Sequence, residues 1–146
     1  MKNQFQQLFL RITLSVTMLS AVADRFGFWG NNSTWGNWGN FEIYTRKLTF
    51  FLSETLSVVS AYIATSLEIL FSGMLIIGYK TRIASYGSGM LLLIFALSMT
   101  IAFGVKAPLD YSVWVGCAGT FLLAVQKEYP YSIDHMFKKN NLNLLI

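Results

Sequence analysis

Four long runs of apolar residues limit this chain to a narrow set of folds. They occupy residues 5–23, 55–78, 82–103 and 111–125. A helix needs about 20 residues to cross a hydrocarbon core about 30 Å thick, and the fourth run is the shortest candidate. Strands of a transmembrane barrel would alternate apolar and polar residues, which these runs do not. We therefore predict an all-α membrane protein, an antiparallel bundle of four transmembrane helices.

The composition agrees with this class of protein. Of the 146 residues, 54% are hydrophobic and 12% are charged, whereas a soluble domain carries about 25% charged residues. The length leaves room for a single domain over residues 1–146. The net charge of +4 comes from scattered cations without a long basic run, so we expect contact with the lipid bilayer and no nucleic-acid partner.

The positions of lysine and arginine predict the orientation, because cytoplasmic loops are enriched in them. One side of the membrane would hold Lys2, Arg11, Lys80, Arg82, Lys127, Lys138 and Lys139. The other side would hold Arg25, Arg46, Lys47 and Lys106. Both termini are then expected in the cytoplasm, with the loop at residues 24–54 outside. Since Arg11 interrupts the core of the first run, we expect that run to stay attached and not to act as a cleaved signal.

One acidic residue, Glu68, stands near the middle of the second run. A charge at the bilayer centre costs about 2.5–3.5 kcal/mol on insertion scales, so it normally faces a partner, a cavity or a ligand. Small residues share its helical stripe: Ser57, Ala61, Ala64 and Ser72. Because small residues let another helix approach closely, we expect Glu68 to point into the bundle.

Arg11 is the cation that we expect to meet Glu68. It lies about 9 Å from the inner edge of the first run, and Glu68 lies about 15 Å deep in the second, at 1.5 Å per residue. Two long side chains can cover that difference, so an Arg11–Glu68 pair, direct or through water or a ligand, is the predicted catalytic centre. The alternative is that Arg11 extends its guanidinium to the lipid headgroups.

The loop at residues 24–54 is rich in tryptophan, including Trp35 and Trp38. Indole rings gather at the membrane–water boundary, so one interpretation is an interfacial anchor. The other is an aromatic wall over a site that opens outward. Apolar residues in 41–52 recur at helical spacing and predict a short amphipathic helix along the outer surface.

Two aspartates flank the runs on the outer side. Asp110 directly precedes the fourth run, where it would cap a helix, or would join Asp24 in a charged rim. The chain has a single cysteine, Cys117, and a single histidine, His135. We therefore expect no metal site and no intramolecular disulfide.

A spaced pattern joins the second and third runs: Glu68-x4-Gly73-x4-Gly78-x3-Arg82-x-Ala84, with Arg11 early in the first run. On these residues the chain resembles the DoxX family of small membrane proteins. The stretches 21–27 and 107–112 look like a branch of that family. Many members carry Gly-x-x-Lys near the end of the first helix, where this chain has Ala-Val-Ala-Asp24-Arg25.

The resemblance implies a four-helix protein linked to membrane redox systems, since the family takes its name from a subunit of thiosulfate:quinone oxidoreductase. We accordingly expect a membrane subunit that interacts with quinone through a buried Glu/Arg pair, in the bacterial cytoplasmic (inner) membrane. No cofactor is expected to be covalently bound, because one cysteine and one histidine cannot ligate haem or an iron–sulfur cluster in the usual ways. Electrons would then come from a redox protein partner or a larger membrane complex.

The second function left open is a non-enzymatic assembly, structural or small transport component. For a ligand-binding protein, we expect a narrow, mostly apolar cavity that reaches Glu68 and is bounded by the first three runs. The residues expected to contribute to ligand binding are Asp24, Trp35, Trp38, Arg82 and Asp110.

Overall fold

The structure, a computed structural model, describes residues 4–137, and this part of the chain contains helices and no strands. The elements are α1 (Gln4–Arg25), the 3-10 helix η1 (Gly30–Asn32), α2 (Trp38–Leu48), α3 (Glu54–Ile77), α4 (Thr81–Phe103), α5 (Lys106–Asp110) and α6 (Val113–Ala124). Lys2, Lys138 and Lys139, which contribute to the predicted orientation, lie outside the described residues.

Helices α1, α3 and α4 contain 22, 24 and 23 residues and are long and apolar enough to cross a membrane. At 1.5 Å per residue, each is about 33–36 Å long. These lengths indicate an integral membrane protein in contact with lipid.

The fourth apolar run folds differently from a single long helix. Helix α6 has 12 residues, about 18 Å, which is less than the thickness of the hydrocarbon core. It is preceded by the separate short helix α5, and Ser112 between them has a φ of 54°. The predicted capping role of Asp110 is wrong, because Asp110 ends α5 and the residue before α6 is Ser112, which makes no side-chain capping bond.

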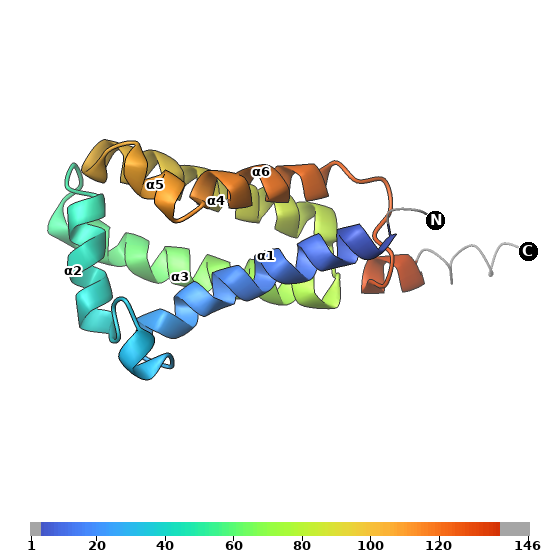
Figure 1. Cartoon of the computed structure of the whole chain (residues 1–146), viewed down its shortest axis with the longest axis horizontal. Helices are drawn as coiled ribbons and strands as arrows, with labels where there is room; N and C mark the ends of the chain where they lie inside the picture. Colours follow the sequence, from blue (N-terminus) through green and yellow to red (C-terminus); the bar gives the residue numbers. More distant parts are fainter. Residues whose placement is uncertain (1–3, 138–146) are drawn as a thin grey trace, which may run out of the picture.

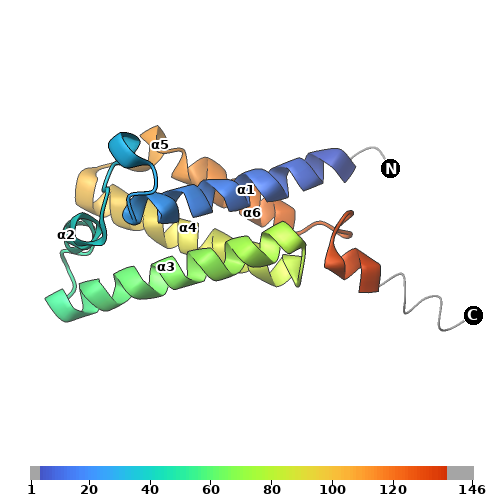
Figure 2. The same ribbon diagram turned by 90° about the horizontal axis from the view of Figure 1, so that it is seen from below.

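The long helices lie side by side, and α2 crosses one end of them (Figure 1). Helix α1 packs against α3 and α6, and α4 packs against α3 and α6. We call the end that carries α2 the α2 end. The opposite end, which we call the turn end, carries the α3–α4 turn, the start of α1 and residues 129–137 (Figure 2).

Residues near the C-terminus close the turn end. Helix α3 stops at Gly78, whose φ of 70° is left-handed. The Asp134 carboxylate accepts hydrogen bonds from the backbone N–H groups of Lys80 (2.8 Å) and Thr81 (2.7 Å), which start α4. The N–H of Asp134 in turn donates to the carbonyl of Gly78 at 3.0 Å. Asp134 therefore satisfies donors at the start of α4 that have no partner within the helix.

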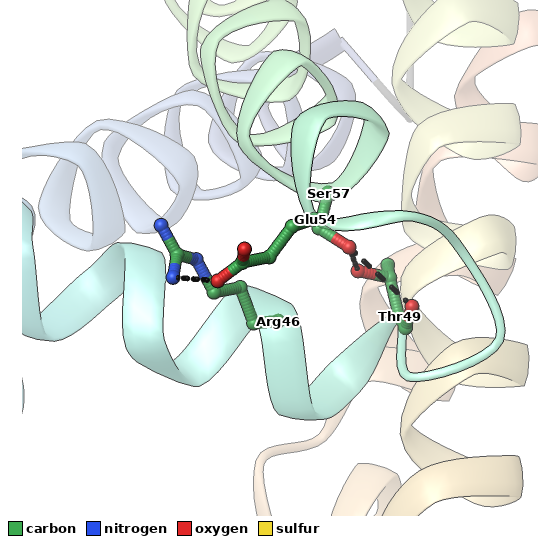
Figure 3. A network of polar contacts seen from close by, with 4 residues as sticks. All are labelled: Arg46, Thr49, Glu54 and Ser57. Atoms are coloured by element: carbon green, nitrogen blue, oxygen red, sulfur yellow. Dashed lines mark hydrogen bonds and ion pairs between the residues drawn. The ribbon is translucent and has the colours of Figure 1, made fainter.

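A corner between α2 and α3 fixes the angle at the α2 end (Figure 3). The hydroxyls of Thr49 and Ser57 lie 2.8 Å apart and are buried. On the exposed side of the same corner, Arg46 pairs with Glu54 at 2.5 Å. The helix predicted over residues 41–52 is present as α2, but it begins earlier and ends at Leu48, because the chain turns there into α3.

We predict that Gly78→Ala destabilises the protein more than Gly30→Ala. Both glycines have positive φ, which costs a residue with a Cβ roughly 1–2 kcal/mol. A Cβ at Gly78 would also lie 2.3 Å from the Cβ of Ser132, whereas a Cβ at Gly30 meets nothing within 4 Å. Thermal unfolding in detergent checks this, and equal losses in the two variants would contradict the close packing at the turn end.

Candidate functional site

A buried ion pair joins α1 to α3. Arg25, the last residue of α1, pairs through Nη1 with Oε2 of Glu68, and each side chain is 3% exposed. The same Nη1 donates a hydrogen bond to Thr65 Oγ1 at 2.5 Å. Glu68 therefore does point into the protein, but the predicted Arg11–Glu68 pair is wrong, since Arg25 is the partner.

Arg11 lies at the turn end, away from Glu68. Its Nη2 donates to the carbonyl of Tyr131 at 2.7 Å, and its Nη1 would lie 2.9 Å from a Cβ placed on Gly78. Glu68 is ten residues from Gly78, about 15 Å along α3. The expectation that Arg11 extends to headgroups is also wrong, because Arg11 is 2% exposed.

Arg25 is buried because α1 ends beside the middle of α3 and does not extend to the α2 end of the molecule. Thr65, which Arg25 contacts, is 11 residues from the start of α3, about 16 Å along the helix. Helix α2 and the loop before it cover the space above Arg25. The Arg25 guanidinium carbon lies 4.1 Å from the centre of the Phe41 ring and 5.8 Å from that of Trp35. The cation is therefore shielded by aromatic rings in addition to the Glu68 carboxylate.

Asp24 helps to fold this cover. It is buried, and its carboxylate accepts a hydrogen bond from the backbone N–H of Thr34 at 2.8 Å. That bond ties the loop back onto the end of α1, directly before Trp35. Asp24 thus positions the aromatic cover and does not belong to an exposed charged rim.

A pocket of about 340 Å³ opens beside the ion pair. Its lining consists of Phe26, Trp38, Tyr62, Thr65, Ser66 and Ile69. The Trp38 and Tyr62 rings have centroids 4.6 Å apart, and those of Phe26 and Trp38 are 5.7 Å apart. The prediction of a cavity that reaches Glu68 between the first three apolar runs is therefore wrong. This pocket is bounded by α3, α2 and the residue after α1, and it reaches Thr65 and not Glu68.

Thr65 connects the pocket to the ion pair. Its hydroxyl accepts a hydrogen bond from Arg25 and can donate its own proton to an oxygen in the pocket. A hydroxyl that accepts from a cation becomes a stronger donor, because successive hydrogen bonds polarise one another. The arrangement therefore suits a molecule with a flat ring and a hydrogen-bond acceptor.

The structure separates the predicted site residues into two groups. Trp38 lines the pocket. Trp35 packs near the guanidinium of Arg25, and Asp24 holds the loop that precedes Trp35. Arg82 is exposed at the turn end and donates to the carbonyl of Gln126 at 3.1 Å. Asp110 is exposed and pairs with Lys106 within α5. Neither of these two lines the pocket.

Arg25 and Thr65 are the main residues absent from the predicted site. Thr65 could have been found from the helical stripe, because the buried positions of α3 are Ser57, Ala61, Thr65, Glu68, Ser72 and Leu75. Ala64, which we expected on that stripe, is only half-buried. Arg25 gave no such signal, since its burial depends on α2.

Removing one partner of the ion pair is expected to destabilise the protein by about 3–5 kcal/mol, because it leaves a buried charge without its partner. Arg25→Met and Glu68→Met should each show this loss, and the double variant should recover most of it. The exposed Arg46–Glu54 pair is the matched control, for which Arg46→Met should cost about 0–1 kcal/mol. Unfolding free energies measured as a double-mutant cycle check the coupling, and additive losses would show that the two charges act separately.

Comparison with known proteins adds no relative at this point. No protein-family model, curated protein or solved structure matches the chain.

Proposed function

We propose that this chain is a DoxX-like membrane subunit of a redox system that binds a quinone in the aromatic pocket. The observation that carries this proposal is the position of Thr65, which lines the pocket and accepts a hydrogen bond from buried Arg25. A quinone offers the matching chemistry, since it has a flat ring that stacks on aromatic side chains and carbonyl oxygens that accept hydrogen bonds.

The exposure of the pocket lining supports entry from lipid. Tyr62 is 53% exposed and Ile69 47% exposed, although both stand on a helix long and apolar enough to cross a membrane. Exposed apolar residues on such a helix face hydrocarbon, so a lipid-soluble molecule can enter sideways without crossing water. In this proposal α5 and α6 together complete the fourth crossing of an antiparallel four-helix bundle, in the bacterial inner membrane with both termini cytoplasmic.

The ion pair would act on the bound ring through Thr65. Reduction of a quinone to a quinol takes up two electrons and two protons, and negative charge develops on the ring oxygens as electrons arrive. A hydroxyl held by a fixed cation stabilises such charge without reorganising. In this proposal the electrons come from a redox protein partner, and Thr65, Arg25 and Glu68 orient the ring and compensate its charge.

The alternative is a non-enzymatic assembly, structural or small transport component. It is favoured by a specific observation, namely that Glu68 does not line the pocket and that its charge is paired with Arg25. In that case the pair sets the register of α1 against α3 and nothing more. The Arg25→Met, Glu68→Met double variant separates the two functions, because a structural pair predicts restored cellular function along with restored stability.

Thr65→Val is expected to weaken binding of a quinone analogue about fivefold to tenfold. The substitution keeps the shape of the side chain and removes the hydroxyl. The ligand loses one hydrogen bond, worth about 1 kcal/mol, and Arg25 loses its hydrogen bond to Thr65. Quenching of tryptophan fluorescence by the analogue reports binding, because Trp38 lines the pocket. Thr100→Val is the control, since Thr100 Oγ1 bonds to the carbonyl of Ala96 at 2.7 Å and does not line the pocket.

Two results would contradict the quinone proposal. The first is equal affinity in wild type, Thr65→Val and Thr100→Val. The second is quenching that persists when Tyr62→Ala removes a wall of the pocket.

A further inference from the structure

Helix α1 is displaced along the bundle relative to α3. At the α2 end α3 extends past α2 whereas α1 stops short of it, and at the turn end α1 extends past the α3–α4 turn (Figure 1 and Figure 2). Contacts at both levels define the offset, since Arg25 meets Thr65 and Arg11 lies beside Gly78. About 16 Å of α3 precedes Thr65, and about 10 Å of α1 precedes Arg11.

The loop over residues 26–34 stays at the level where α1 ends. The indole N–H of Trp29 donates to the carbonyl of Ser20 at 3.1 Å, which holds the loop beside the last turns of α1. Phe26, the first residue of the loop, lines the aromatic pocket together with Ile69 of α3. The loop therefore lies beside the middle of α3 and not beyond its end.

At this level the surfaces of α3 and of the loop differ in polarity. On α3, Ile63 is 55% exposed and Leu70 54% exposed, as expected for a helix that faces hydrocarbon. On the loop, the amide side chains of Asn31 and Asn32 are exposed next to Trp29. Irregular loops do not face the hydrocarbon core, because polar groups find no hydrogen-bond partner there. Amide and indole groups belong instead in the headgroup layer.

The turn end shows the opposite difference. Phe5 and Phe9 stand on the part of α1 that extends past Gly78, and they are 72% and 63% exposed. Their rings stack on each other with centroids 6.4 Å apart. Lys80, in the α3–α4 turn, is exposed and charged. The apolar surface of α1 is therefore displaced toward the turn end, in the same direction as the helix itself.

We propose that residues 26–34 are a binding surface for lipid headgroups, and that the boundary of the hydrocarbon around this protein is stepped. Beside α1 the boundary is shifted toward the turn end by roughly 10 Å, so the headgroups of the leaflet on the α2 side descend to the loop. A bilayer accommodates such a mismatch by thinning locally, at a modest cost.

The step places the mouth of the aromatic pocket where headgroups meet hydrocarbon, because Phe26 belongs to the loop and Ile69 to α3. This border suits a molecule with a polar ring and an apolar tail. The use of the border by a quinone rests on the proposed function, whereas the step in the boundary does not.

The test compares the surroundings of spin labels at matched positions on the two helices. Asn31→Cys is paired with Leu70→Cys, and Phe9→Cys with Lys80→Cys, each in a Cys117→Ala background so that it carries one thiol. The labelled protein is placed in nanodiscs of phosphatidylcholine and phosphatidylglycerol. Electron paramagnetic resonance then gives the collision rates of each label with oxygen, which concentrates in hydrocarbon, and with the polar complex nickel(II) ethylenediaminediacetate.

We expect the oxygen-to-nickel collision ratio to be about tenfold lower at position 31 than at position 70, and about tenfold higher at 9 than at 80, because hydrocarbon excludes the polar complex. Equal ratios within either pair would overturn the proposal, since a flat boundary treats both positions alike. Low collision rates with both reagents at position 31 would also overturn it, because they would show that another protein chain covers the loop.

Unchanged thermal unfolding shows that each variant keeps the fold. Asn32→Cys, at the neighbouring exposed position, replaces Asn31→Cys if that variant fails this check. Since no quinone enters the measurement, its outcome is independent of the Thr65→Val result.

Discussion

The Arg25–Glu68 ion pair sets the main constraint on this structure, because two charges inside an apolar protein must be shielded on every side. The carboxylate and guanidinium meet each other, and Thr65 takes a further guanidinium hydrogen. The remaining face of Arg25 is covered by Phe41 of α2. Without this cover, the end of α1 would leave the pair open to solvent or headgroups. The loop and α2 are therefore part of the interior and not an accessory on the surface.

The pair also divides the interior into two chemically different regions. Toward the α2 end, aromatic rings surround a pocket whose one buried hydroxyl is that of Thr65. Toward the turn end, the interior contains an apolar cluster of Leu14, Leu75, Ala84, Leu123 and Tyr129, together with the buried hydroxyls of Ser72 and Ser88. A ligand that enters from lipid suits the first region.

At the turn end, too, buried polar groups are paired with each other. Asp134 serves the start of α4, and Arg11 donates to the carbonyl of Tyr131. Gly78 leaves room for these contacts, because a side chain there would collide with Ser132 and with the Arg11 guanidinium. The two arginines of α1 thus have distinct tasks, one at each end of the helix.

Much of this structure was determined by local sequence. The three long apolar runs gave helices within two residues of the predicted bounds, because backbone groups in lipid must be satisfied within the helix. The burial of Glu68 followed from the small residues on its stripe. The helix in the loop followed from apolar spacing. These features could be predicted from the spacing of residues along the chain.

The partner of Glu68 was decided by the tertiary structure alone. The predicted depth of each residue was counted from the end of its apolar run. This count assumes that every helix starts at the same membrane plane, and it therefore favours Arg11 as the partner of Glu68. In the folded protein α1 ends at the level of Thr65, about 16 Å along α3, and α2 fills the space above it. The depth of Arg25 therefore depends on how α1, α2 and α3 pack together, and no sequence period records that offset.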